Sequence, residues 1–98
     1  MPIYSRQSEI SQALANPYRI AIIDYLKDGE KTVKDIAETI GAMQPVTSNH
    51  LAYMKKRGIV KTRKAKTQVY YRLASPKIAE ATDLLKELVK EQISQKKA

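Results

Sequence analysis

The sequence predicts a mainly α-helical fold that carries one small β-hairpin. Four segments with apolar residues at helical spacing lie before residue 58, and a fifth follows residue 75. Residues 59–73 instead combine β-branched side chains with an alternating run, which is typical of two short strands. The 98 residues suffice for one domain, residues 1–98, in the order helix, helix, helix, helix, strand, strand, helix.

The first two helices meet at Asn16 and Pro17. Asn is a favoured N-cap residue, and the fixed φ angle of Pro suits the first helical position. The first helix is therefore expected over residues 5–15, and the second from Pro17 to the stop signal at Gly29. We expect deep burial for the apolar residues of the second helix, which are Ile20, Ile22, Ile23 and Leu26.

The next two helices have the spacing of a helix-turn-helix motif. Thr32 is a candidate N-cap with Asp35 three residues later, as in a capping box, and Gly41 ends the third helix. Pro45 marks the first turn of the fourth helix. Because only a few residues around Gly41 separate the two helices, residues 32–57 are predicted to form a helix-turn-helix.

A basic hairpin over residues 59–73 follows this motif directly, with a short polar connection at residues 63–67. The alternation predicts that Gln68, Tyr70 and Arg72 face outward and that Val69, Tyr71 and Leu73 face inward. A hairpin in this position makes the fold a winged helix-turn-helix. Ser75 is expected to cap the last helix, over residues 75–95.

The positive charge of the chain is concentrated in one block. The net charge is +8, yet residues 39–79 contain nine Lys or Arg residues and no Asp or Glu. A solvated lysine-rich surface normally intersperses both signs. An acid-free basic block instead indicates a polyanionic partner, and double-stranded DNA is the partner that a helix-turn-helix suggests.

Composition argues against several classes of function. The chain has no Cys and one His, which excludes disulfides, thiolate metal sites and His-rich metal sites. No apolar run approaches the roughly 18–20 residues of a membrane span, and the first residues lack an apolar signal core. We therefore expect a cytoplasmic, nucleoid-associated protein with no membrane partner. No catalytic arrangement is recognisable around His50, so neither an enzyme nor a cofactor is expected.

Five short motifs resemble the ArsR–SmtB family of winged-helix transcriptional regulators. Residues 15–20, Ala-Asn-Pro-Tyr-Arg-Ile, resemble the opening motif of that family. Residues 44–51 resemble its recognition helix, which commonly ends in Ser-x-His-Leu. The other three motifs are residues 33–37, 56–60 and 69–73. Each motif alone is short, but the five occur in the family's order and spacing over residues 8–90.

The resemblance implies a homodimer in which the first and last helices, residues 5–15 and 75–95, form the interface. Each protomer then places one recognition helix in the DNA major groove. The interface candidates are Ile10, Leu14, Leu84, Leu85, Leu88 and Val89. The same terminal helices leave room for a small-molecule effector, although the sequence does not mark its identity.

Many members of this family sense metals or thiols, and the sequence departs from them. Residues 32–36, at the start of the third helix, contain no cysteine pair, and the last helix carries carboxylates but no His. Carboxylates alone make a poor transition-metal site, so no metal is expected. We expect these carboxylates to form a solvated face, in which Asp83 pairs with Lys86 and Glu87 with Lys90.

The first turns of the fourth helix carry side chains suited to reading bases. Gln44 and Asn49 can each pair bidentately with adenine, and Ser48 can contact a base or a phosphate. Pro45 and Val46 are suited to a thymine methyl group. In the alternative interpretation, Gln44 only caps the helix. The remaining DNA-contact candidates are Thr32, Lys34, His50 and Lys56, together with Arg63, Lys64 and Lys66 at the wing tip.

These observations favour a sequence-specific transcriptional regulator, a repressor that acts as a homodimer by occluding an inverted-repeat operator. Two alternatives stay open. The acid-free wing suits an architectural, chromatin-like protein with little sequence preference, although the polar recognition helix argues against it. A protein-interaction winged helix is the other alternative, although such a module has no need of nine unopposed cations.

Overall fold

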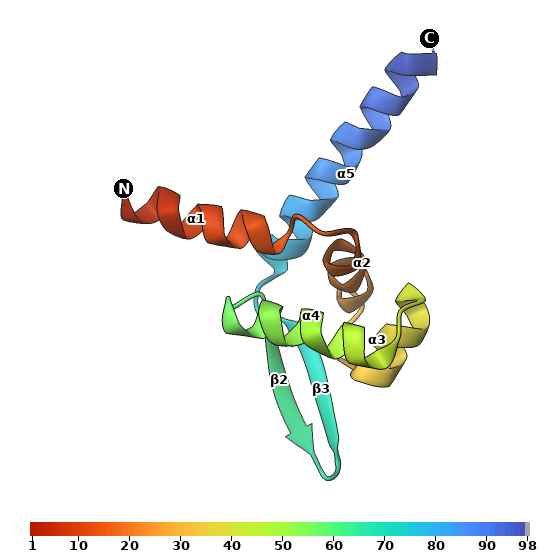
Figure 1. Cartoon of the computed structure of the whole chain (residues 1–98). Helices are drawn as coiled ribbons and strands as arrows, with labels where there is room; N and C mark the ends of the chain where they lie inside the picture. Colours follow the sequence, from red (N-terminus) through yellow and green to blue (C-terminus); the bar gives the residue numbers. More distant parts are fainter. Residues whose placement is uncertain (98) are drawn as a thin grey trace.

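The computed structural model describes residues 1–97, which fold into five helices and a small antiparallel sheet (Figure 1). The elements are α1 (Pro2–Ala13), α2 (Pro17–Leu26), β1 (Lys31–Thr32), α3 (Val33–Ile40), α4 (Gln44–Lys56), β2 (Val60–Ala65), β3 (Gln68–Leu73) and α5 (Pro76–Lys97). The predicted winged helix-turn-helix class is confirmed, with one additional strand between α2 and α3. Ala98, the last residue of the predicted domain, lies outside the described residues.

Local hydrogen bonds set the starts of α2 and α3 where the sequence predicts them. Oδ1 of Asn16 accepts hydrogen bonds from the backbone N–H groups of Tyr18 and Arg19, at 2.9 and 3.2 Å. Oγ1 of Thr32 accepts from the backbone N–H of Asp35 at 3.2 Å. Gly41 ends α3 in the left-handed conformation, with a φ of 70°. Each N-cap of this kind contributes about 1 kcal/mol to stability.

Helix α1 begins and ends earlier than the expected range 5–15. Pro2 occupies its first turn, where the missing N–H costs no hydrogen bond. At the other end, Asn16 has an extended backbone with a φ of −154° and a ψ of 130°. Because the residue before a proline is pushed away from the helical region, the chain leaves the helix before Ala15.

Strand β1 is a two-residue element that the sequence pattern does not predict. It pairs antiparallel with β3, Lys31 opposite Tyr71 and Thr32 opposite Tyr70. The sheet order is therefore β1-β3-β2. Two residues are too few to show an alternating pattern, so this strand exists only because β3 lies beside it.

The core lies where α2, α3 and α4 meet the start of the wing. Its buried members are Ala13, Ile22, Ile23, Leu26, Ile36, Leu51, Met54, Ile59 and Val60. Tyr71 and Leu73 pack against this core as expected. Two predicted core residues are not buried, because Ile20 is 40% exposed and Val69 is 38% exposed. Val69 pairs with Lys64 near the far end of the hairpin, and Ile20 lines a cavity beside α5.

Helix α5 and the β2–β3 hairpin extend from the body of the molecule in different directions (Figure 1). The first turns of α5 pack against α2 and β3, and the rest of the helix projects away. Helix α4 crosses the base of the hairpin, so the recognition helix and the wing lie at the same end of the molecule. Within residues 1–97, none of the helices combines the length and the apolar composition needed to cross a bilayer.

Candidate nucleic-acid interface

The first turns of α4 present a polar face to solvent. Gln44, Ser48 and Asn49 are all exposed, as are Pro45 and Val46 beside them. The structure therefore brings the five predicted base-reading residues onto the open side of one helix. The side-chain amides of Gln44 and Asn49 and the hydroxyl of Ser48 can donate and accept hydrogen bonds, as base recognition in a major groove requires.

The opposite face of α4 anchors the helix in the core. Thr47, Leu51 and Met54 are fully buried, and the Thr47 hydroxyl donates to the carbonyl oxygen of Met43 at 3.1 Å. The N-cap of α4 is Met43, which makes no side-chain capping bond. Gln44 follows it as the first helical residue, so the interpretation that Gln44 only caps the helix is wrong.

Met43 is a member of this surface that the sequence pattern misses. It is 73% exposed and directly precedes Gln44. Methionine is usually buried, so only its position before a solvent-facing first turn hints at this exposure. A flexible thioether here can contact a thymine methyl group or the edge of a base.

His50 lies half-buried on the side of α4 that faces α2. Its ring stacks on Tyr18, with 5.7 Å between centroids, and its Nδ1 lies 3.4 Å from Nη1 of Arg19. The pKa of His50 is lowered below its ordinary value, mainly by partial burial and to a smaller extent by the positive charge of Arg19. In the DNA-free chain the imidazole is therefore mainly neutral at pH 7.

Arg63 is not at the wing tip but within β2, opposite Tyr70. Its Nε and Nη2 donate to the carboxylate of Glu30 at 2.9–3.2 Å, and its guanidinium lies over the Tyr70 ring. This ion pair lowers the pKa of Glu30 and raises that of Arg63. The tip itself is the turn at residues 66–67, where Lys66 has a positive φ of 58°. Lys66 is exposed in that turn, whereas Lys64, which is also exposed, lies within β2 opposite Val69 and is therefore not at the tip as predicted.

The remaining predicted contacts lie beside the helix-turn-helix. Lys34, in the first turn of α3, and Lys56, in the last turn of α4, are both exposed. Thr32 is half-buried, because it pairs in β1 and its hydroxyl accepts the capping bond of α3. Accepting this bond leaves the hydroxyl hydrogen of Thr32 free to donate, so this end of α3 offers both a hydroxyl and backbone N–H groups to a phosphate.

The basic block stays largely free of acidic partners in the folded chain. Within residues 1–97, Arg63 is the one cation of residues 39–79 that forms an ion pair. The other eight basic residues of the block keep their charge available to an external anion. The folded molecule thus carries this positive field at the wing and at the end of α4.

A second candidate surface runs along α5. Leu84, Leu85, Leu88 and Val89 are each about half exposed or more, with Leu84 at 66%. Leu85 and Val89, together with Leu14 and Ile20, line an apolar cavity of about 220 Å³. Ile10 instead lies partly buried against the core. Exposed leucines at helical spacing are typical of a helix that a partner covers.

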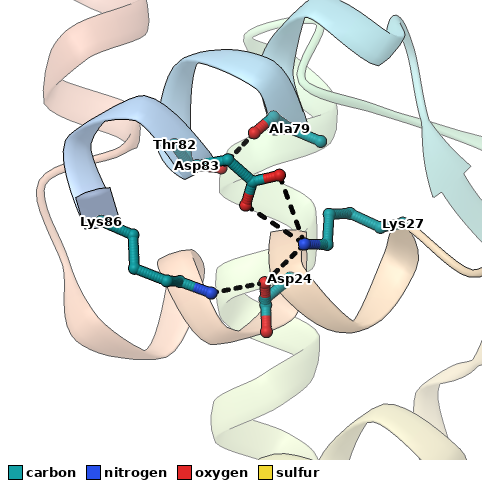
Figure 2. A network of polar contacts seen from close by, with 6 residues as sticks. All are labelled: Asp24, Lys27, Ala79, Thr82, Asp83 and Lys86. Atoms are coloured by element: carbon teal, nitrogen blue, oxygen red, sulfur yellow. Dashed lines mark hydrogen bonds and ion pairs between the residues drawn. The ribbon is translucent and has the colours of Figure 1, made fainter. Parts of the chain in front are cut away.

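An ion-pair network joins α5 to α2 (Figure 2). Nζ of Lys27 lies 3.1 Å from both Asp24 and Asp83, and Nζ of Lys86 lies 2.8 Å from Asp24. The predicted pairing of Asp83 with Lys86 inside α5 is therefore wrong, because both side chains reach across to α2. Hydrogen bonds from Lys86 and then Lys27 lower the pKa of Asp24.

The described residues also bear on two smaller predictions about α5. Among the ion pairs within residues 1–97, none joins Glu87 to Lys90. In the same part of the chain, no group of three or more His, Cys, Asp or Glu side chains converges as a metal site would require. Asp24 and Asp83 are both engaged by lysines (Figure 2).

Comparison with known proteins decides the family. The model for the "Bacterial regulatory protein, arsR family" matches residues 16–62, from the N-cap of α2 into β2. The chain is 32% identical over 78 residues to the biofilm growth-associated repressor of Xylella fastidiosa, a match that covers 80% of this chain and 68% of that protein. It is 35% identical over 89 residues to an HTH-type transcriptional regulator of Methanocaldococcus jannaschii, covering 90% of this chain and all of that protein. The chain belongs to the ArsR family.

Comparison with a solved structure shows that the similarity extends over nearly the whole chain. The homodimeric winged helix-turn-helix DNA-binding domain from Mycobacterium bovis superposes with a TM-score of 0.85 at 30% identity, covering 96% of this chain and 87% of that one. The resemblance inferred from the five sequence motifs is thereby confirmed. As an ArsR-family regulator, the chain has α3 and α4 as its helix-turn-helix and β2–β3 as its wing.

Proposed function

We propose that the chain is a sequence-specific, double-stranded-DNA-binding transcriptional repressor that acts as a homodimer on an inverted-repeat operator. The observation that carries this proposal is the exposed face of α4. There Gln44, Ser48 and Asn49 point to solvent while Thr47 and Leu51 hold the helix in the core. Polar side chains on a rigid, outward-facing helix suit direct reading of base edges.

In this proposal α4 enters the major groove, where Gln44 and Asn49 pair with adenines. Lys64 and Lys66 of the wing follow the phosphates or enter the adjacent minor groove, and Lys56 holds the backbone beside α4. These cations position the protein, whereas the amides supply the preference for sequence. The acid-free surface also raises the rate of encounter with DNA.

The dimer is proposed to form through the apolar stripe of α5 and the end of α1. The exposed Leu84, Leu85, Leu88 and Val89 supply the surface, and Leu14 lies beside them at the apolar cavity. The related Mycobacterium bovis domain is described as homodimeric and DNA-binding, and the Xylella relative is named a repressor. Two recognition helices related by a two-fold axis favour half-sites separated by about one helical turn, or a multiple of it.

Repression then follows from a dimer that occludes a promoter. The proposal assigns the chain no catalytic step, and it places the protein on nucleoid DNA in the cytoplasm. The cavity between α2 and α5 is the place where a small-molecule effector would act, because it adjoins the proposed dimer surface. An apolar lining of this kind suits an uncharged apolar molecule.

The alternative of an architectural DNA-binding protein is supported by the eight cations of the basic block that form no ion pair within residues 1–97. The two functions predict different binding behaviour. A sequence reader prefers one duplex strongly, whereas an architectural protein binds all duplexes with the same steep salt dependence. A measured ratio of affinities therefore separates them.

The test selects duplexes from a randomised pool with the full chain and compares affinities by fluorescence anisotropy. The two probes are the enriched duplex and the unselected pool, each at several salt concentrations. We expect the enriched duplex to bind more tightly by a factor on the order of 10³. Equal affinity for both probes would support the architectural alternative. If neither probe binds at low salt, the protein-interaction module is the alternative that remains.

A further inference from the structure

Arg19, in α2, connects the end of α1 to the recognition helix α4. Its Nε donates to the carbonyl oxygen of Ala13 at 2.7 Å, and its Nη2 donates to that of Gln12 at 3.2 Å. Its Nη1 lies 3.4 Å from Nδ1 of His50, and its guanidinium carbon lies 4.3 Å from the centre of the Tyr53 ring. One side chain therefore contacts the last turn of α1 and two residues of α4.

The two contacted residues of α4 hold its base-reading face in place. His50 directly follows Asn49, and Tyr53 lies about one helical turn further along the same helix. Tyr18 stacks on the ring of His50 and supports it from α2. Because a helix turns as a unit, contacts that fix His50 and Tyr53 also fix the direction in which Asn49 points.

The chemistry of this connection requires a guanidinium. The carbonyl oxygen of Ala13 lacks an i+4 partner because Pro17 has no N–H, whereas that of Gln12 accepts from the backbone N–H of Ala15 at 3.1 Å. Both lie at the C-terminal end of the helix, where partial negative charge favours a cation. Arg has N–H donors and no acceptor, so Nδ1 of His50 must be unprotonated to accept its bond, and the ring hydrogen must sit on Nε2. A lysine at position 19 keeps the charge but cannot span the carbonyls, His50 and Tyr53 together.

We propose that Arg19 is a positioning residue for DNA recognition, which locks the rotation of α4 to the end of α1. This inference rests on the proposed function, in which α1 belongs to the dimer interface and α4 reads bases. In the dimer, Arg19 then sets the angle between the two recognition helices without touching DNA. Its guanidinium is already engaged by Ala13, Gln12 and His50.

The experiment compares Arg19→Lys with the wild-type chain on two probes, the duplex that the wild type enriches from a random pool and the unselected pool. We expect the affinity ratio between these probes to fall about tenfold, the size of a lost base contact. The affinity for the unselected pool and its salt slope should stay unchanged, because the positive charge is retained.

Arg6→Lys is the matched control. Arg6 also joins α1 to the end of α4, where it donates to the carbonyl oxygen of the C-cap residue Arg57 at 3.3 Å, and its other partner is Glu9 within α1. We expect this variant to keep the wild-type affinity ratio. An equal fall in both variants would overturn the proposal, since any loosening of α1 on α4 would then suffice. Loss of affinity for both probes alike in Arg19→Lys, or no change for either, would also overturn it.

The single His of the chain provides a second measurement that needs no DNA. The ¹⁵N chemical shifts of its imidazole report which nitrogen carries the hydrogen. We expect the Nε2–H tautomer in the wild type and a mixture of tautomers in Arg19→Lys. An Nδ1–H tautomer in the wild type would overturn the proposal even if the variant does not fold. If the wild type enriches no duplex, the proposed function fails and the positioning role fails with it, whatever tautomer is found.

Discussion

The guanidinium of Arg63, in the wing strand β2, forms a bidentate ion pair with the carboxylate of Glu30, which lies just before β1. Nε and Nη2 of Arg63 reach both carboxylate oxygens, with a shortest distance of 2.9 Å. Within residues 1–97, this is the one ion pair that engages a cation of the basic block. Glu30 thus pairs with a guanidinium group that could otherwise bind a DNA phosphate.

The variant Glu30→Gln is therefore expected to strengthen DNA binding. Releasing Arg63 adds one phosphate contact, which steepens the slope of log affinity against log salt by about 0.9. Glu38→Gln removes the same charge from an exposed position in α3 and serves as the control. Anisotropy titrations at several salt concentrations provide the measurement. Identical slopes for the two variants would show that Arg63 does not reach DNA.

The variant Leu85→Lys is expected to produce folded monomers. Leu85 is 57% exposed and lines the apolar cavity beside Val89, at the centre of the proposed dimer surface. A buried, unpaired ammonium group at this position costs more than the contact contributes. Ser94→Lys adds the same charge at an exposed polar position, about half a turn around α5 from Leu85, and should remain dimeric. Sedimentation velocity measures both, and an intact Leu85→Lys dimer would refute this interface.

The free energy of unfolding is expected to fall as the pH drops below about 6.5. The pKa of His50 is lowered from its ordinary value of 6.5, first by burial and then by Arg19. The unfolded chain therefore binds a proton more readily than the folded chain, and stability is lost as the pH falls toward the folded-state pKa. Urea unfolding at pH 7.5 and 5.5 measures this loss, at a fixed protein concentration.

The variant His50→Gln provides the control for this pH dependence. It removes the titrating ring, so its stability should change much less between the same two pH values. Lys86 and Lys27 lower the pKa of Asp24 from its ordinary value of 3.8, so protonation of Asp24 changes stability only near or below that pH. Asp24 therefore does not contribute between pH 7.5 and 5.5. An unchanged pH dependence in His50→Gln would assign the effect to another group.

Two substitutions at buried residues that anchor α4 are expected to lower the free energy of unfolding by different amounts. Leu51→Ala removes a fully buried side chain and is expected to cost about 2–5 kcal/mol. Thr47→Val keeps the volume, and the Met43 carbonyl oxygen retains the backbone N–H of Thr47 as a donor at 3.0 Å. Its cost should stay below about 1.5 kcal/mol. Urea unfolding measures both, and similar losses would mean that the Thr47 hydroxyl carries the anchoring.

Much of the fold follows from local chemistry that a sequence displays directly. Asn16 and Thr32 cap helices because their side chains reach N–H groups two or three residues away. Gly41 ends α3 because glycine accepts the left-handed conformation at no cost. Likewise, the inward register of Thr47 and Leu51 leaves Ser48 and Asn49 outside, so the open face of α4 is also predictable.

What could not be predicted depends on residues far apart in the chain. Strand β1 has no pattern of its own and forms because Tyr70 and Tyr71 lie opposite it. Asp83 and Lys86 have suitable spacing for a pair within α5, but the crossing of α5 over α2 supplies better-placed partners (Figure 2). The contact of Arg19 with His50 spans 31 residues, so no local motif displays it.

The central claim, that α4 reads sequence while the wing holds phosphates, is tested most directly by comparing Asn49→Ala with Lys64→Ala. The affinity of each variant is measured for two probes, the duplex that the wild type enriches and the unselected pool, at several salt concentrations. Asn49→Ala should lower the affinity ratio about tenfold, at a cost of about 1–3 kcal/mol, and keep the salt slope. Lys64→Ala should keep the ratio and lower the slope by about 0.9. A ratio unaffected by Asn49→Ala would contradict the account.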